Sequence, residues 1–199
     1  MTPRHLTKFG CAAAVAVVSA TMLSLGGGAA AQPVATLLAT DSEITFVSRQ
    51  MGVPVTGRFT RFDAQIALDP RRPETGRVAF TIPVASATIG VRETDAELPK
   101  PAWFDAAKHP SASFESTAIK ALGEGRFEVA GKLAIKGAAR DVVVPVALAQ
   151  AGQRSIATGA FTIKRLDFGI GEGEWSDTSI VANDVQVRFK LALSGLPPL

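Results

Sequence analysis

The chain has 199 residues and a formal net charge of +3 at pH 7, with basic and acidic residues dispersed along it. This length suits a single domain, and so small a charge excludes the dense basic surface that nucleic-acid binding requires. With a single cysteine, the chain cannot form an internal disulfide.

The first segment, residues 1–31, is predicted to be a signal peptide. Arg4 and Lys8 form a basic start, residues 11–25 form an apolar run, and small residues precede a cleavage position at Gln32. The apolar run is shorter than the about 20 residues that a helix needs to span a bilayer. We therefore expect export to the periplasm, in preference to the alternative of an uncleaved N-terminal anchor.

Cleavage at Gln32 would remove the only cysteine, two basic residues and one of the two histidines. The formal net charge would fall from +3 to +1, and His109 would be the only histidine left. These losses exclude a cysteine nucleophile and the usual zinc sites, so we expect no metal and no cofactor.

The rest of the chain has the period-2 alternation of apolar residues that is typical of half-buried strands. Turn-forming residues lie at 69–76, 123–125 and 151–153, and residues 137–141 are expected to form a tight hairpin connection. The predicted strands are 42–48, 53–59 continuing to 68, 77–84, 113–119, 126–136, 142–149, 155–168 and 184–193.

The strand predicted over residues 53–68 changes its apolar parity part of the way along. Val55 and Phe59 are odd-numbered, whereas Phe62 and Ile66 are even-numbered. A slip of one residue without a turn indicates a bulge or bend, which long strands need in order to coil around a closed sheet. A sandwich corner would give the same pattern, and we favour an antiparallel barrel over a sandwich.

Only residues 93–108 have a helical pattern, and prolines at 99, 101 and 110 break it into pieces. This segment carries the aromatic pair Trp103 and Phe104. Because it is the only helical interruption among the strands, we expect it to form a lid over one end of the barrel.

Four phrases, in this order, resemble the YceI family of bacterial lipid-binding proteins. They are V-T-G-R-F-T-R-F-D-A-Q-I-A-L-D-P at 55–70, W-F-D-A-A-K-H-P-S-A-S-F-E-S-T at 103–117, the hairpin F-E-V-A-G-K-L-A-I-K-G-A-A-R-D-V-V-V-P-V at 127–146, and K-R-L-D-F-G-I at 164–170. Two positions depart from the family pattern. Thr94 precedes Asp95 where the family usually has Arg-Asp. Gln50 and Met51 precede Gly52, whereas in the family a histidine often precedes this glycine.

The resemblance implies a lipocalin-like antiparallel β-barrel of about eight strands with a short helical insertion, over residues 33–195. It also implies that the barrel binds an amphiphilic lipid of the isoprenoid or isoprenoid quinone class and has no enzymatic activity. The protein is then expected to be soluble rather than membrane-spanning.

Phenylalanine without tyrosine suits a dry interior, since the rings bring no hydroxyl groups that need partners. We expect an elongated apolar pocket of a few hundred cubic ångströms or more. Arg49, Arg92 and Arg165 are candidates to face a polar head group. The candidate ligand-binding residues are Phe46, Phe59, Phe80, Ile82, Trp103, Phe104, Phe114, Leu133, Phe161 and Phe168.

Two other functions are compatible with the sequence. Glu172, Glu174 and Asp177 cluster around Trp175 in a glycine-rich loop, and a small hydrolase or isomerase could use Glu174 or Asp177 in the same cavity. Acidic loop residues are more often simply solvated. A structural or adaptor domain with a filled core is the third possibility.

Overall fold

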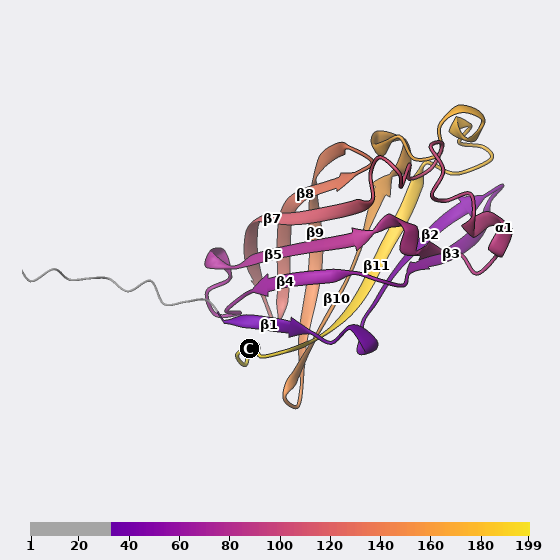
Figure 1. The fold of residues 1–199 in the computed structure, drawn as a ribbon. Coiled ribbons are helices and arrows are strands. Elements are labelled where there is room, and N and C mark those ends of the chain that lie inside the picture. The colour runs from indigo at the N-terminus through magenta and orange to yellow at the C-terminus, as the bar shows by residue number, and fades with distance from the viewer. Residues whose placement is uncertain (1–32) are drawn as a thin grey trace, which may run out of the picture. The chain divides into compact units, whose positions relative to one another are not determined.

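The computed structural model describes residues 33–199, and the predicted signal peptide at 1–31 lies outside this range. The described part is almost entirely antiparallel sheet, with one short α-helix, α1 (Arg92–Asp95) (Figure 1). The strands are β1 (Val34–Leu37), β2 (Glu43–Gln50), β3 (Val53–Phe59), β4 (Asp63–Ala67), β5 (Arg77–Pro83), β6 (Ala87–Thr88), β7 (Ser111–Gly123), β8 (Arg126–Ile135), β9 (Ala138–Ala151), β10 (Arg154–Lys164) and β11 (Asp184–Ser194).

The sheet closes into a barrel of eight strands, as predicted. Its neighbours follow the order β1-β4-β5-β7-β8-β9-β10-β11, and β1 pairs with β11 to complete the ring. At one end of the barrel, β2, β3 and β6 continue the same order beyond β11. Closure leaves few free strand edges, which would otherwise pair with other chains.

Three of the eight long strands are each interrupted once. A 3₁₀ turn at Ala39–Asp41 separates β1 from β2, and another at Val84–Ser86 separates β5 from β6. Residues 60–62 separate β3 from β4, at the place where the parity change predicts a bend. The inward-facing side chains change there from odd to even positions, so this part of the prediction is confirmed.

One local prediction was wrong, and another is confirmed only in part. The connection after β8 is only Lys136 and Gly137, and residues 138–141 already pair with β8, from Ile135↔Ala138 onward. The helical pattern over 93–108, which the prolines were expected to break into pieces, is helical only in α1, and residues 96–110 mostly form successive turns, because the prolines remove donors that a longer helix needs.

The hydrophobic core consists of two clusters, one toward each end of the barrel. The first includes Ile66, Leu68, Phe127 and Leu196, near the end where the C-terminus lies (Figure 1). The second gathers under residues 89–110, which we call the lid, and includes buried side chains of the lid itself. None of the helices within 33–199 has the length and hydrophobicity to cross a bilayer.

Candidate ligand-binding site

The barrel encloses an apolar cavity of about 170 Å³. Alternation along the strands produces it, because every second side chain of a strand such as β8 points inward. Every lining residue is apolar, and no charged or hydrogen-bonding side chain contributes to the wall. The aromatic part of the wall consists of Phe59, Phe80, Phe114, Phe127, Phe161 and Phe189.

The cavity is smaller than the few hundred cubic ångströms predicted from the sequence. An engineered protein cavity of about 150 Å³ is filled by one benzene molecule. A space of this size therefore admits a short piece of a hydrocarbon chain while the surrounding side chains keep their present positions. The phenylalanine rings account for the difference, since they occupy much of the space that the backbone encloses.

Six of the ten predicted ligand-binding residues line this cavity. Most of the aliphatic part of the wall, including Ile44, Ile66 and Leu191, was missed, although the same parity that singled out the phenylalanines also points these side chains inward. The six are Phe59, Phe80, Ile82, Phe114, Leu133 and Phe161.

The other four, Phe46, Trp103, Phe104 and Phe168, belong to the cluster under the lid and do not line the cavity. Phe59 lies between the cavity and two of these residues, Phe46 and Phe104. The ring centre of Phe59 lies 5.5 Å from that of Phe46 and 6.3 Å from that of Phe104. These residues therefore close one end of the barrel.

The lid is attached to the loop that joins β10 to β11. The amide groups of Gly171 and Glu172 in that loop both donate hydrogen bonds to the carbonyl oxygen of Ala102, at 2.8 and 2.9 Å. Trp103 of the lid also packs on Trp175 of the loop, with ring centres 5.6 Å apart. Lid and loop thus form one continuous cover.

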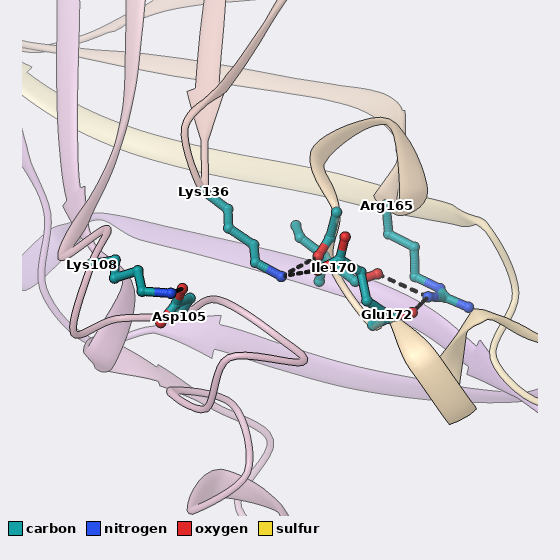
Figure 2. Close-up of polar contacts among 8 residues, drawn as sticks. Asp105, Lys108, Lys136, Arg165, Ile170 and Glu172 are labelled. Carbon is teal, nitrogen blue, oxygen red and sulfur yellow. Dashed lines mark hydrogen bonds and ion pairs between the residues drawn. The ribbon is translucent and has the colours of Figure 1, made fainter.

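A lysine connects the same loop to the β8–β9 turn. Lys136 Nζ donates to the carbonyl oxygen of Gly169 at 2.5 Å and to Glu172 Oε2 at 2.7 Å (Figure 2). Its side chain is only 9% exposed, so this ion pair is partly shielded from solvent. The contact holds a third element to the cover of the barrel.

The three arginines suggested for a polar head group do not reach the cavity. Arg165 is buried, and its guanidinium donates to five main-chain carbonyl oxygens, among them those of Ile170 and Gly171 (Figure 2). Arg49 is partly engaged, since its Nη1 donates to the carbonyl oxygen of Gly52 at 3.2 Å. Arg92 is exposed at the start of α1. None of the three lines the cavity.

The loop carboxylates also lie outside the cavity wall. Glu172 pairs with Lys136, and Glu174 is exposed. Asp177 accepts hydrogen bonds from the hydroxyl and the amide of Ser179, which lower the pKa of its carboxyl below the ordinary value. A low pKa keeps this group ionised and makes it a poor proton donor near neutral pH.

Comparison with known proteins gives one family. The model of the YceI-like domain family matches residues 36–193. Among curated relatives, a UPF0312 protein of Azotobacter vinelandii is 31% identical over 120 residues, which are 57% of this chain and 62% of that protein. The chain thus spans less than two thirds of the length of this relative.

Solved structures of similar fold point the same way. BcnA of Burkholderia cenocepacia is 42% identical, with a TM-score of 0.77 that covers 79% of this chain and 99% of that one. A polyisoprenoid binding domain from Saccharophagus degradans, implicated in plant cell wall breakdown, is 19% identical, with a TM-score of 0.66 over 81% of this chain and 98% of that one. At that identity the second likeness shows the fold.

Proposed function

The chain belongs to the YceI-like domain family, and on that premise we propose that it is a periplasmic carrier that holds the apolar chain of an amphiphilic, isoprenoid-type lipid inside its barrel, without catalysis. The observation that carries this proposal is the closed barrel around a cavity with an entirely apolar wall. Such a wall offers no polar partner for chemistry and matches a hydrocarbon.

The energetic reason for such a carrier is the hydrophobic effect. Each methylene group that leaves water contributes about 0.8 kcal/mol to binding. A lipid that must cross an aqueous compartment is therefore stabilised inside a protein whose cavity excludes water. The cavity described here accommodates only the end of a long chain, so a longer chain requires the phenylalanine side chains to move aside.

Support for the ligand class comes from the relatives. The Saccharophagus domain of the same fold is described as polyisoprenoid-binding. Support for the periplasm comes from the basic start, the apolar run and the cleavage position within residues 1–32. N-terminal sequencing of the exported protein, expected to begin at or near Gln32, tests the location independently of the ligand.

Native mass spectrometry of the protein expressed with its own N-terminal segment tests the ligand. We expect a bound species that organic extraction releases and that fragments as an isoprenoid. Phe161→Arg should abolish this species, because it places an unpaired charge in the apolar cavity, which costs several kcal/mol. A circular dichroism melt must show that the variant is folded.

The matched control for this variant is Val143→Arg. Val143 lies on the outer face of β9 and is 56% exposed, so the same charge there should leave the ligand bound. Replacing Glu174 by Gln and Asp177 by Asn should also leave it bound. A ligand-free protein, or turnover of the ligand that the carboxylate variant loses, would contradict the carrier function.

A further inference from the structure

Two neighbouring strands of the barrel, β1–β2 and β3–β4, lose their pairing over several residues. β2 pairs with β3 from Gln50↔Val53 to Ile44↔Phe59. β1 pairs with β4 only at Ala35↔Ile66 and Val34↔Ala67. Between these two paired stretches, residues 36–43 do not pair with residues 60–65. We call this interval the seam.

Each side of the seam is held by its other neighbour. Thr36 and Leu37 pair with β11, and the Leu38 amide donates to the Ala192 carbonyl oxygen at 2.8 Å. On the opposite side, the Thr60 amide donates to the Ser86 carbonyl oxygen at 3.0 Å. Each side of the seam therefore makes its hydrogen bonds to its other neighbour. The gap results from this strand pairing rather than from an irregular loop.

A groove of about 540 Å³ occupies the seam on the outside of the barrel. Its wall includes Phe59, which also lines the apolar cavity inside. One aromatic side chain therefore borders both spaces. At the lid, by contrast, Leu98, Phe104 and Phe168 are all at least nine-tenths buried.

The rim of the groove carries two arginines and two carboxylates, Arg58, Arg61, Glu43 and Asp63. Within residues 33–199, none of the four side chains makes an ion pair or a hydrogen bond. Their charges sum to zero, so an ionic head group would be attracted by one pair and repelled by the other. A hydroxyl or carbonyl group can accept from a guanidinium, and a hydroxyl can also donate to a carboxylate.

We propose that the seam groove is a second ligand subsite, in which the uncharged polar head of the lipid lies while its chain passes Phe59 into the cavity. This inference rests on the proposed carrier function and adds the entry route and the class of head group. It also explains how a cavity of about 170 Å³ serves a longer molecule, since the part nearest the head occupies the groove.

Retinol and retinoic acid test the head group, because they share an isoprenoid chain and differ in the charge of the head. The double variant Glu43→Gln with Asp63→Asn leaves two arginines, and it should shift the ratio of affinities toward retinoic acid about tenfold, the size expected of one charge-assisted hydrogen bond. Arg58→Gln with Arg61→Gln should shift the ratio the other way. Isothermal titration calorimetry measures both ratios.

The control for charge alone is Glu115→Gln with Asp141→Asn. This variant changes the net charge by the same amount as the seam variant. Both residues are exposed on the outer wall away from the groove, so the ratio of the affinities for retinol and retinoic acid should stay that of the unmodified chain. Charge variants at the seam that behave like this control would overturn the subsite.

The route is tested by stopped-flow fluorescence of retinol. Phe59→Ala removes the side chain between groove and cavity, so association and dissociation should both become about tenfold faster, a change within the range seen among variants of one binding site. Phe80→Ala removes a cavity contact only and should speed dissociation alone. Phe59→Leu provides a milder variant in case the alanine form does not fold.

The two proposals fail differently. Retinol that binds the unmodified chain, with rates that respond equally to Phe59→Ala and Phe80→Ala, would overturn the route and leave the carrier function standing. An unmodified chain that binds neither retinol nor a cellular isoprenoid would overturn the carrier function, and the subsite with it.

Discussion

Arg165 holds the loop between β10 and β11 from inside the protein. Its side chain is almost fully buried, and burial lowers the pKa of the guanidinium, although an arginine remains charged in proteins. The positive charge is compensated by five carbonyl oxygens at 2.6 to 3.1 Å, rather than by a carboxylate. They belong to Ile170, Gly171, Trp175, Val181 and Ala182.

Replacing Arg165 by Met should therefore destabilise the fold strongly. The methionine fills similar volume but leaves buried carbonyl oxygens without donors, and we expect the free energy of unfolding to fall by about 3 kcal/mol or more. Urea unfolding measures this. Arg77→Met, at an exposed position on β5, should change the same quantity by less than about 0.5 kcal/mol. Equal losses in the two variants would contradict the role of Arg165.

Asp95 ties the start of the lid to β6. Its Oδ2 accepts from the hydroxyl of Thr88 at 2.5 Å, and its Oδ1 accepts from the amide of Ile89 at 2.7 Å. The Thr88 hydroxyl makes the largest contribution, and together these hydrogen bonds lower the pKa of the Asp95 carboxyl. The ionised form is thus favoured in the folded protein.

This lowered pKa predicts a pH dependence of stability. A carboxyl whose pKa is lower in the folded state adds stability above its unfolded pKa, about 4, and the contribution is lost as the pH falls through the folded pKa. Asp95→Asn should therefore lose less stability than the unmodified chain when the pH falls below about 4. Urea unfolding over a pH series tests this. Parallel curves for both chains would show that Asp95 does not contribute.

At the scale of the elements, two pairs of neighbouring strands each have a phenylalanine on one strand directly opposite a glycine on the other. Phe46 of β2 is directly opposite Gly57 of β3, and Phe189 of β11 is directly opposite Gly159 of β10. A Cβ atom added at either glycine would overlap the ring. The glycines thus let the rings lie flat against the neighbouring strand, an arrangement that also fixes the register of each pair.

Gly57→Ala should destabilise the barrel by about 1 to 3 kcal/mol, the usual cost of overpacking. The cause should be the overlap with the Phe46 ring, so shortening that side chain should relieve it. In a double-mutant cycle, we expect Phe46→Leu to cost less in the Gly57→Ala background than in the unmodified chain. Additive losses measured by urea unfolding would place the strain elsewhere.

The sequence predicts some elements better than others for physical reasons. Alternation identifies β8 because one face of this strand is buried along its whole length. The lid residues have a helical pattern that the prolines were expected to break into pieces, and beyond Asp95 the structure has turns. The short strands β1 and β6 lack enough residues for a period to show.

For the candidate site, the sequence predicts the direction of side chains better than the volume that they leave free. Parity points Phe80 and Phe114 inward, but it does not show how far their rings fill the interior, and so the predicted volume was too large. Trp103 was assigned to the ligand because it lies in the only helical interruption, where a lid was expected, whereas it packs on Trp175 of another loop. The seam arises from pairings between strands distant in sequence, which no local pattern encodes.

For the whole molecule, buried apolar side chains cover both ends of the cavity. The lid and its loop cover one end, and Leu68 and Leu196 are buried at the other. An apolar void of this kind stays dry, because water would find no hydrogen-bond partner on its walls. Such a void should bind small apolar molecules in preference to water.

Benzene should therefore bind in the unmodified chain and raise its melting temperature. A ligand that binds only the folded state stabilises it by an amount that grows with the logarithm of its concentration over its dissociation constant. Ala157→Leu should abolish this rise. Ala157 lines the cavity, so the larger side chain fills the void and should cost less than about 1 kcal/mol.

Ala112→Leu is the matched comparison for the filling variant. Ala112 is 5% exposed but does not line the cavity, so the added atoms meet packed neighbours and should cost about 1 to 3 kcal/mol. If this variant folds, it should keep its response to benzene. A thermal melt series with and without benzene distinguishes the two. An unmodified chain that gains no stability from benzene would mean that side chains already fill the interior, and the lipid would then have no space to enter.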